Sequence, residues 1–500
     1  MKEYSLKQRL IKNSFWSLSI SLINKIGSLI FAVILARFLM PENFGIYSIA
    51  LSIAVLVSTF ADLGINSALV RFISYSLYKE KRKISAYYRY LLKIKFILAI
   101  VTSVFLLIAA YPLSFYVFKN ANLFLPLLIS SFYIFISAFD SFYVQIFYSI
   151  EKVGYASTRE AISQIMRIII ALILFFLFSS EYYVSSIFVS LTITSIIMLV
   201  FSLYYSKKLL PALYKKTNEK IDKMRVNRFI FFLTIASISA VLFSNIDSIL
   251  LGLFVSPEYV GYYRAAFIFV AGLSSLILFP NIILLPILSK IGKLDKQRVT
   301  HQIIKYISII AIPATFGIIV LGKYFIKILY GSSYLPASFL LYILSFLIFP
   351  IIITGILLPL FSSEEKTNIF AKLILFTSII NITLNIILIK ALLPYSDFHA
   401  TMGAAIAVLI SWFYYFFATL YYVKKELHFS INFASSIRPL LASIAMFILL
   451  QIIAFYISDM SLILGIFLVI LGVLVYLFFL FMFGGIKKKE LEILKEIFKM

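Results

Sequence analysis

The sequence PENFGIY at residues 41–47 recurs later in the chain as PEYVGYY at residues 257–263. A proline that starts a helix sacrifices no hydrogen bond, because the first helical N–H has no partner within the helix. A glutamate beside it suits the positive end of the helix dipole, and a glycine lets neighbouring helices approach closely. Each copy therefore predicts a tight turn, here called the corner, after which a new helix begins. The matched residues are Pro41, Glu42, Gly45 and Tyr47 in the first copy and Pro257, Glu258, Gly261 and Tyr263 in the second.

The composition around these corners is that of a membrane protein. Hydrophobic residues make up 62% of the 500-residue chain and charged residues 13%, and the mean hydropathy is +1.04. Soluble domains carry about 25% charged residues, so a soluble chain this apolar could not cover its own surface. The chain has no cysteine, which excludes disulfides and thiolate metal sites. Its three histidines lie far apart in loops, so no metal site is predicted.

A transmembrane helix needs about 20 mainly apolar residues, and fourteen segments of the chain fit this description. We therefore predict an all-α polytopic membrane protein. The segment 339–361 contains Pro350 and Pro359, so we expect a kink in it. The predicted spans are 13–38, 44–73, 96–118, 123–150, 162–179, 187–206, 229–254, 265–288, 303–322, 339–361, 369–389, 402–423, 439–457 and 462–484.

Lysine and arginine gather in alternate connecting segments, which include residues 74–95, residues 207–228 and both ends of the chain. Because positive residues mark the cytoplasmic side of a membrane, both termini are expected in the cytoplasm. The net charge of +24 then indicates topology and an attraction to anionic lipids, rather than a nucleic-acid partner.

In this topology both copies of the corner lie on the outer side, each between the first and second helices of a set of six. Two copies with one offset predict two six-helix lobes. Since six is an even number, the lobes are parallel repeats related by an axis along the membrane normal. The predicted parts are an N-lobe at 1–206, a basic cytoplasmic loop at 207–228, a C-lobe at 229–423, and two further helices with a basic tail at 424–500.

A few charged side chains lie deep inside the predicted spans, where each costs about 2.5–3.5 kcal/mol. Polar residues at helical spacing accompany these charges. Examples are Asn24 beside Lys25 on the first span, and Asn381 and Asn385 on the span 369–389. These stripes predict one polar cavity between the lobes, whose cations would suit an anionic substrate. The alternative is simple contact between helices, for example a pair of Lys25 with an aspartate. The deep charges are Lys25, Asp62, Asp140, Arg167 and Asp247.

One stretch imitates a nucleotide-binding motif. GIIVLGKY at residues 317–324 matches the start of a phosphate-binding loop, but Tyr324 stands where Ser or Thr is needed. The stretch also ends a predicted span instead of following a strand. We therefore expect no ATP site and no cofactor. The connecting loops are too short to hold a catalytic domain, so an enzyme is not expected.

Two segments resemble a known family. FAVILARFLMPENFGIYSIALSIAVLVSTFADLGINSALVRF, residues 31–72, and SNIDSILLGLFVSPEYVGYYRAAF, residues 244–267, are similar to bacterial polysaccharide exporters of the Wzx type, the O-antigen flippases. These belong to the multidrug/oligosaccharidyl-lipid/polysaccharide superfamily. The resemblance implies a MATE-like fold of two lobes that alternate between inward-open and outward-open states in the bacterial cytoplasmic membrane.

The resemblance also implies a substrate and its partners. The substrate would be an undecaprenyl-pyrophosphate-linked oligosaccharide, flipped from the cytoplasmic to the outer leaflet for O-antigen or capsule synthesis. Lys25, Arg167 and Asn24 would meet the pyrophosphate, and an ion gradient or the membrane potential would drive transport. The coupling candidates are Asp62, Asp140 and Asp247. A polymerase and glycosyltransferases of the same pathway are expected partners.

Other functions stay open at this point. A multidrug-type exporter would tolerate neutralisation of Lys25. A lipid II flippase would share the lipid chemistry, and in such proteins the two extra helices form a groove for lipid. A membrane-embedded polymerase or acyltransferase is a further alternative. The neighbouring genes would distinguish an oligosaccharide flippase from these alternatives, because genes for sugar-nucleotide enzymes and glycosyltransferases are expected to flank a flippase gene.

Overall fold

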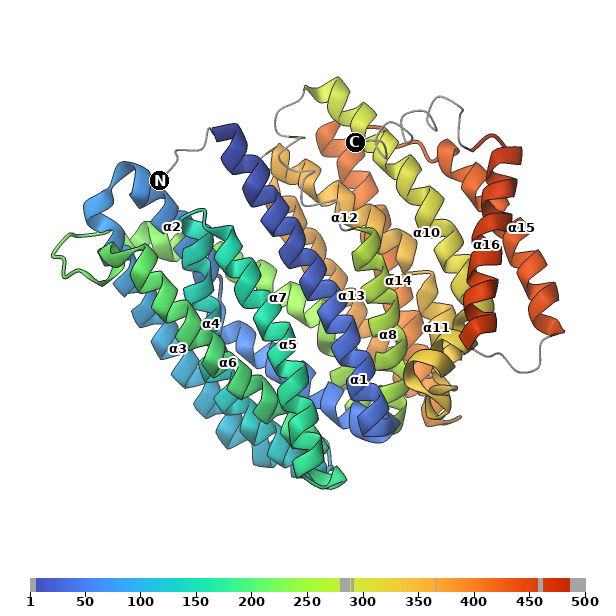
Figure 1. The fold of residues 1–500 in the computed structure, drawn as a ribbon, viewed down its shortest axis with the longest axis horizontal. Helices are drawn as coiled ribbons and strands as arrows, with labels where there is room; N and C mark the ends of the chain where they lie inside the picture. The colour runs from blue at the N-terminus through green and yellow to red at the C-terminus, as the bar shows by residue number, and fades with distance from the viewer. Residues whose placement is uncertain (1–5, 279–287, 289–291, 365, 457–461, 486–500) are drawn as a thin grey trace. The chain divides into compact units, whose positions relative to one another are not determined.

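The computed structural model describes residues 6–278, 288, 292–364, 366–456 and 462–485. Throughout these residues the regular structure is helical (Figure 1), which confirms the predicted all-α class. Large apolar side chains point outward along the helices, among them Ile108, Phe176 and Val200. Such exposure is what a lipid-facing surface requires, because apolar side chains are at no disadvantage in a bilayer.

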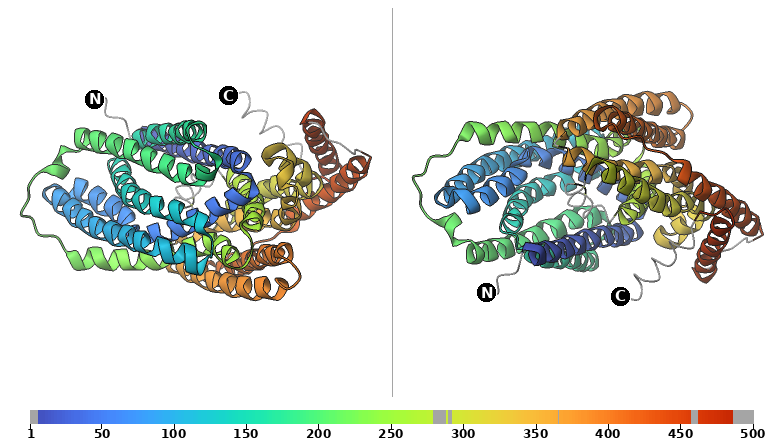
Figure 2. Two further views of the ribbon diagram at one scale, coloured as in Figure 1. Left: turned by 90° about the horizontal axis from the view of Figure 1, so that it is seen from below. Right: turned by 90° about the horizontal axis from the view of Figure 1, so that it is seen from above.

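The first half of the chain forms seven long helices. They are α1 (Leu6–Asp62), α2 (Ile65–Lys79), α3 (Ile84–Pro112), α4 (Phe124–Ser149), α5 (Val153–Leu177), α6 (Tyr183–Leu209) and α7 (Lys223–Phe254). Single turns of helix lie between several of them: η1 (Lys81–Lys83), η2 (Leu113–Val117), η3 (Ala121–Leu123), η4 (Ser180–Tyr182) and η5 (Pro211–Tyr214). Helices α3, α4 and α6 run side by side (Figure 1 and Figure 2).

The second half continues the helical pattern. Its elements are α8 (Pro257–Ile277), α10 (Lys293–Tyr330), η6 (Ser332–Tyr334), α11 (Ala337–Ser345), α12 (Ile348–Ser363), α13 (Thr367–Leu392), α14 (Asp397–Leu427), α15 (Ala434–Phe455) and α16 (Leu462–Met482). The kink predicted for 339–361 is confirmed, since α11 and α12 are bent by 43°. Pro350 lies in the first turn of α12, and it has no N–H with which to continue the helix from the carbonyl of Phe346 at the end of α11.

Both corners have the predicted local form. Pro257 is the first residue of α8, with Glu258 in the first turn. Pro41 follows Met40, whose positive φ of 60° puts a kink into α1 at this point. The kink separates the predicted spans 13–38 and 44–73, although α1 continues through it.

The predicted single span 44–73 is wrong in one respect, because a break divides it. Leu63 and Gly64 have φ values of 44° and 81°, in the left-handed region, so α1 ends at Asp62 and α2 begins at Ile65. Glycine adopts this conformation without a steric penalty. A β-carbon on Gly64 would also lie 2.6 Å from Cβ of Leu233, which shows how closely α7 approaches the break.

Among the described residues, twelve helices are long and apolar enough to cross a membrane, or thirteen with α11 and α12 as one span. This is close to the predicted fourteen. The count of twelve treats the kinked region Ser19–Lys79 as one helix, whereas the sequence predicted two spans there.

The chain divides into two compact units. The first unit is Met1–Arg264 with Phe370–Ala407, and the second unit is Ala265–Ile369 with Val408–Met500. Buried apolar side chains of α2, α3, α4 and α7 form the core of the first unit, and those of α10, α15 and α16 a core of the second. The predicted lobe boundaries at 206 and 423 differ from these units and stay a prediction. The predicted basic tail lies largely outside the described residues.

Candidate functional site

Helices α1 and α5 hold the predicted cationic site within the first unit. Gln164 of α5 donates from Nε2 to Oδ1 of Asn24 at 2.9 Å. One turn further along both helices, Nη2 of Arg167 donates to Oγ of Ser28 at 3.2 Å. The Arg167 guanidinium also lies 4.5 Å from the centre of the Phe31 ring. Asn24, Ser28 and Phe31 recur at helical spacing on one face of α1, and this face receives the polar side chains of α5.

Lys25 lies on the same stretch of α1, next to Asn24 and three residues before Ser28, and its side chain is half-buried. Residues three apart are neighbours on a helix surface. Lys25 thus lies within one helical turn of Ser28, the residue to which Arg167 donates. Glu160, Tyr47 and Tyr133 lie within electrostatic range of the Arg167 guanidinium.

A chain of polar contacts leads from this site to Asp140 of α4. Gln164 also donates to Oε1 of Glu160 at 2.8 Å, and Nη1 of Arg159 donates to Oε2 of Glu160 at 2.9 Å. Arg159 in turn forms an ion pair with the buried Asp140. The ion-pair partner of Asp140 is therefore Arg159 of α5, and not Lys25, which the sequence had offered as an alternative partner for an aspartate.

The sequence analysis missed Arg159 and Glu160, because it placed them in a cytoplasmic loop. The structure starts α5 at Val153, so both residues lie in the helix. The i, i+4 spacing of Glu160 and Gln164 in STREAISQ was an available signal, since residues four apart meet on a helix.

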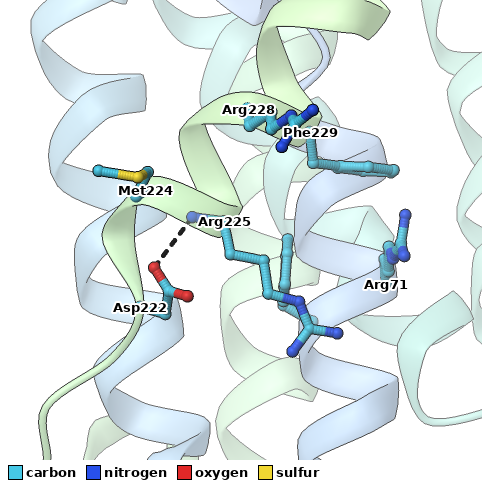
Figure 3. Close-up of a pocket in the computed structure, with 7 residues that line it drawn as sticks. Arg71, Asp222, Met224, Arg225, Arg228 and Phe229 are labelled. Atoms are coloured by element: carbon cyan, nitrogen blue, oxygen red, sulfur yellow. Dashed lines mark hydrogen bonds between the residues drawn. The ribbon is translucent and has the colours of Figure 1, made fainter.

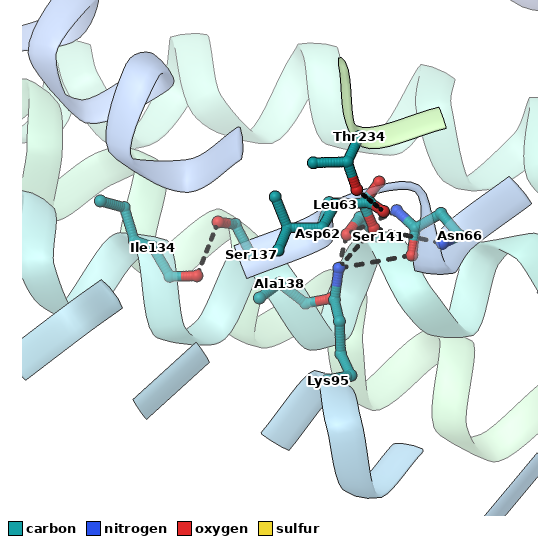
Figure 4. Close-up of polar contacts among 9 residues, drawn as sticks. All are labelled: Asp62, Leu63, Asn66, Lys95, Ile134, Ser137, Ala138, Ser141 and Thr234. Carbon is teal, nitrogen blue, oxygen red and sulfur yellow. Dashed lines mark hydrogen bonds and ion pairs between the residues drawn. The ribbon is translucent and has the colours of Figure 1, made fainter. Parts of the chain in front are cut away.

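A second polar cluster surrounds Asp62 at the break between α1 and α2 (Figure 4). Nζ of Lys95 lies 2.8 Å from Oδ1 of Asp62 and donates at 3.4 Å to Oδ1 of Asn66. The Asn66 N–H donates to Asp62, and the Asn66 side chain donates to Ser141 of α4. On the other side, Thr234 of α7 donates to the Leu63 carbonyl at 3.0 Å.

These contacts identify what the cluster does for the fold. A broken helix leaves backbone groups without partners; the Asp62 carboxylate accepts one such N–H and the Thr234 hydroxyl satisfies one such carbonyl. Lys95, only 1% exposed, neutralises the carboxylate. The sequence analysis counted Lys95 in the basic loop 74–95, but α3 begins at Ile84 and carries it into the protein. Asp62 therefore pairs with Lys95, not with Lys25.

A third cluster is built around Asp247 of α7, whose side chain is 3% exposed. The Tyr263 hydroxyl donates to Oδ2 at 3.2 Å, and Nδ2 of Asn385 donates to Oδ1 at 2.9 Å. Asn381, fully buried, lies one turn earlier on α13. Three polar residues singled out in the sequence on separate helices thus meet here. Tyr263 belongs to the second copy of the corner, and its counterpart Tyr47 lies within electrostatic range of Arg167 and Arg264.

The second unit contains an apolar cavity of about 510 Å³. Helices α10, α12, α14 and α15 enclose it, and phenylalanines dominate its walls. They include Phe316, Phe346, Phe349, Phe413, Phe416 and Phe433. Such a lining suits a hydrocarbon chain, because its polar side chains, Thr315 and Ser436, already form hydrogen bonds within the protein.

The chain is similar in sequence to a family model and to known membrane proteins. The family model described as "Polysaccharide biosynthesis protein" matches residues 10–292. Over 251 residues the chain is 27% identical to a probable lipid II flippase MurJ of Rickettsia prowazekii (strain Madrid E). This match covers 45% of this chain and 46% of that protein. Over 335 residues it is 25% identical to an uncharacterized membrane protein in the cps region of Klebsiella pneumoniae, 66% of each chain. The match spans less than two thirds of either relative.

Solved structures share the fold. A lipid II flippase MurJ in an inward closed conformation matches with a TM-score of 0.73 at 20% identity, covering 93% of this chain and 97% of that one. An inward-facing multidrug resistance MATE family transporter of the MOP superfamily matches with a TM-score of 0.65 at 11% identity, covering 83% and 99%. The predicted MATE-like fold is confirmed by these likenesses.

Proposed function

Because the chain belongs to the polysaccharide biosynthesis protein family, we propose that it flips a lipid-linked oligosaccharide across the bacterial cytoplasmic membrane. The substrate is an undecaprenyl-pyrophosphate-linked oligosaccharide of O-antigen or capsule synthesis, and it moves from the cytoplasmic to the outer leaflet by alternating access. Both termini of the protein face the cytoplasm. The glycosyltransferases of the pathway act before it, and the polymerase acts after it.

The observation that carries this proposal is the pair of cations on α1 and α5. Lys25 and Arg167 lie within apolar spans, where charged side chains are costly and mark substrate or ion pathways. A pyrophosphate supplies several negative oxygens at once, and guanidinium and ammonium groups bind such oxygens strongly. Asn24 and Ser28 add polar groups beside the cations.

The apolar cavity of the second unit supports a lipid-linked substrate. Its phenylalanine-rich walls have the character of a site for part of a polyprenyl chain. The relatives point the same way, since one is described as a probable lipid II flippase and another comes from a cps region. Neither name fixes the sugar.

Of the three coupling candidates, Asp247 is the best supported. Asp62 and Asp140 are each held by a cation, Lys95 and Arg159 respectively. The hydrogen bonds to Asp247 come instead from the neutral donors Tyr263 and Asn385. A buried carboxylate that is hydrogen-bonded by neutral donors, with the Arg264 guanidinium within electrostatic range, can exchange a proton or a small cation as the protein changes state. Such an exchange would link transport to an ion gradient or the membrane potential without ATP.

The fate of lipid-linked oligosaccharide in a strain that lacks the gene tests the function. We expect the intermediate to accumulate on the cytoplasmic leaflet, and surface polysaccharide to be lost, until the wild-type chain is supplied. Complementation by Lys208→Ala, which changes an exposed lysine outside the cationic site, is the control. Normal polysaccharide with no trapped intermediate would overturn the proposal. Loss of peptidoglycan precursor export would indicate a lipid II flippase, and drug sensitivity alone a multidrug-type exporter.

A further inference from the structure

A basic pocket of about 420 Å³ lies between α2 and the first turns of α7, within the first unit (Figure 3). Three arginines and one carboxylate contribute the charges of its lining. The principal lining residues are Arg71, Phe72, Asp222, Arg225, Arg228 and Phe229, which we call the arginine pocket. These residues lie outside the cationic site and outside the clusters around Asp62, Asp140 and Asp247.

The floor of the arginine pocket is fixed by the hydrophobic core. Phe72 is 2% exposed, stacks on Tyr87 at 5.2 Å between ring centres and meets the edge of Phe229 at 5.9 Å. Val226, fully buried, anchors the first turn of α7 in the same core. The Tyr90 hydroxyl donates to Oδ1 of Asn227 at 2.7 Å and ties this turn to α3. The backbone that carries the arginines is therefore held in place before any ligand arrives.

Aromatic rings orient two of the three guanidinium groups. Arg71 lies 4.3 Å from the centre of the Phe229 ring, and Arg225 lies 5.5 Å from that of Tyr75. A cation stacked on a ring uses the face of the guanidinium and leaves its N–H edge available. Asp222 uses one carboxylate oxygen to cap α7, accepting from the Arg225 backbone N–H at 3.0 Å.

The protein only partly balances the positive charge of the arginine pocket, since Asp222 is the one carboxylate in its lining. Within the described part of the chain, no ion pair joins Arg71, Arg225 or Arg228 to a carboxylate. All three side chains are exposed. An open concave site with three guanidinium groups, two of them oriented by aromatic rings, can therefore accept an anion from outside the chain.

The position of the pocket selects the kind of anion. α7 begins at Lys223 and continues as an apolar span, so its first turns lie where the membrane meets water. Met224, an apolar side chain that is 81% exposed, also lines the pocket, on the side opposite Arg71. A ligand that presents phosphate oxygens next to hydrocarbon matches both features, and guanidinium forks bind phosphate with two parallel hydrogen bonds.

We propose that Arg71, Arg225 and Arg228 bind the phosphate group of a lipid headgroup. Two lipids carry this chemistry: an anionic phospholipid of the bilayer, such as phosphatidylglycerol, and a polyprenyl diphosphate such as the substrate proposed above. A phospholipid site requires no transport of oligosaccharide, so the proposal goes beyond the proposed function and can hold if that function fails.

Binding of lipids to the purified full-length chain in detergent tests the proposal, with native mass spectrometry or a fluorescent headgroup as readout. The ligands are phosphatidylglycerol, undecaprenyl diphosphate, phosphatidylcholine and undecaprenol, with inorganic pyrophosphate as competitor. We expect each arginine-to-glutamine change in the pocket to weaken binding of a phosphate-bearing acidic lipid about tenfold, since a hydrogen bond to a charged group contributes about 1.5–3 kcal/mol. Undecaprenol, which lacks phosphate, is expected not to compete.

A matched control separates the pocket from general charge. The variant Arg71→Gln with Arg225→Gln and Arg228→Gln removes three positive charges, and Lys81→Gln with Arg82→Gln and Lys208→Gln removes three at exposed positions outside the pocket. Equal weakening in both variants, or none in the first, would overturn the proposal. Both are compared at equal helical content and thermal midpoint. Arg71→Lys provides a second variant that keeps the charge and the fold but loses the fork, and it is expected to bind with intermediate affinity.

The ligand arms identify the source of the phosphate. Weakened binding of phosphatidylglycerol alone assigns the site to the bilayer lipid. Weakened binding of undecaprenyl diphosphate alone assigns it to a lipid of the transport pathway.

Discussion

Gly45 and Gly261, the glycines of the two copies of the corner, lie against each other's helix. A β-carbon on Gly45 would overlap the carbonyl oxygen of Pro257, and one on Gly261 would overlap that of Pro41. The contact is reciprocal: each glycine touches the proline that opens the other copy. Such self-complementary contacts are characteristic of a two-fold relationship; the parallel repeat of two lobes stays a prediction. The recurring motif thus joins its own two copies.

This contact makes both glycines intolerant of any side chain. Gly45→Ala and Gly261→Ala are each expected to lower the stability of the folded protein by about 1–3 kcal/mol, because backbone atoms must move to admit the methyl group. Thermal unfolding of the purified variants measures this. Gly317→Ala is the control, since nothing lies within 4 Å of a β-carbon there. An unchanged midpoint for Gly45→Ala would contradict the close approach.

The Asp62–Lys95 pair is expected to respond asymmetrically to mutation. Lys95 is 1% exposed and Asp62 34%, so Asp62→Asn leaves a buried, unpaired charge and is expected to cost about 3–5 kcal/mol. Lys95→Met leaves a carboxylate that water can reach, and is expected to cost less. The double variant is expected to recover part of the loss. Stability in detergent, measured for all four proteins, checks the order; additive losses would show that the two side chains are not coupled.

Lys25 is expected to matter for transport and not for folding. Lys25→Ala is predicted to reduce the rate of flipping about 10–100-fold at unchanged protein level. This factor corresponds to the free energy that one hydrogen bond to a charged group contributes. Lys25→Arg retains the charge with altered geometry and is expected to keep part of the activity. Leaflet-specific labelling of lipid-linked oligosaccharide provides the measurement. Full activity of Lys25→Ala would favour an exporter whose cavity needs no cation.

Asp247 and Asp140 are expected to differ when each is changed to asparagine. Asp247→Asn keeps the shape of a side chain bonded by neutral donors, so the protein should fold but lose the stimulation of transport by an ion gradient. Asp140→Asn leaves Arg159 without its buried partner and is expected to lower the protein level. Transport in vesicles with and without proton and sodium gradients distinguishes the two. Gradient-stimulated transport by Asp247→Asn would exclude it as the coupling residue.

Much of the architecture could be predicted because it depends on local properties of the chain. Runs of apolar residues mark the spans, since an apolar helix is stable in lipid wherever it lies in the sequence. Pro41 and Pro257 mark helix starts because a proline's missing N–H matters only within its own helix. Pro350 predicted the bend in the span that forms α11 and α12 for the same local reason.

The partners of the buried charges could be found only from the tertiary structure. The sequence identified Asp62, Asp140 and Asp247 as unusual, because a carboxylate in an apolar span is costly whatever surrounds it. Lys95, Arg159 and Asn385 meet them from other helices, and which helices pack together is not written in either segment alone. The break at Leu63 and Gly64 was hidden in the same way, since the exposed Leu63 carbonyl accepts a hydrogen bond from the Thr234 hydroxyl of α7. The sequence by itself determined where the chain enters the membrane and which charges need an explanation; the packing of helices decided which of those charges are already neutralised.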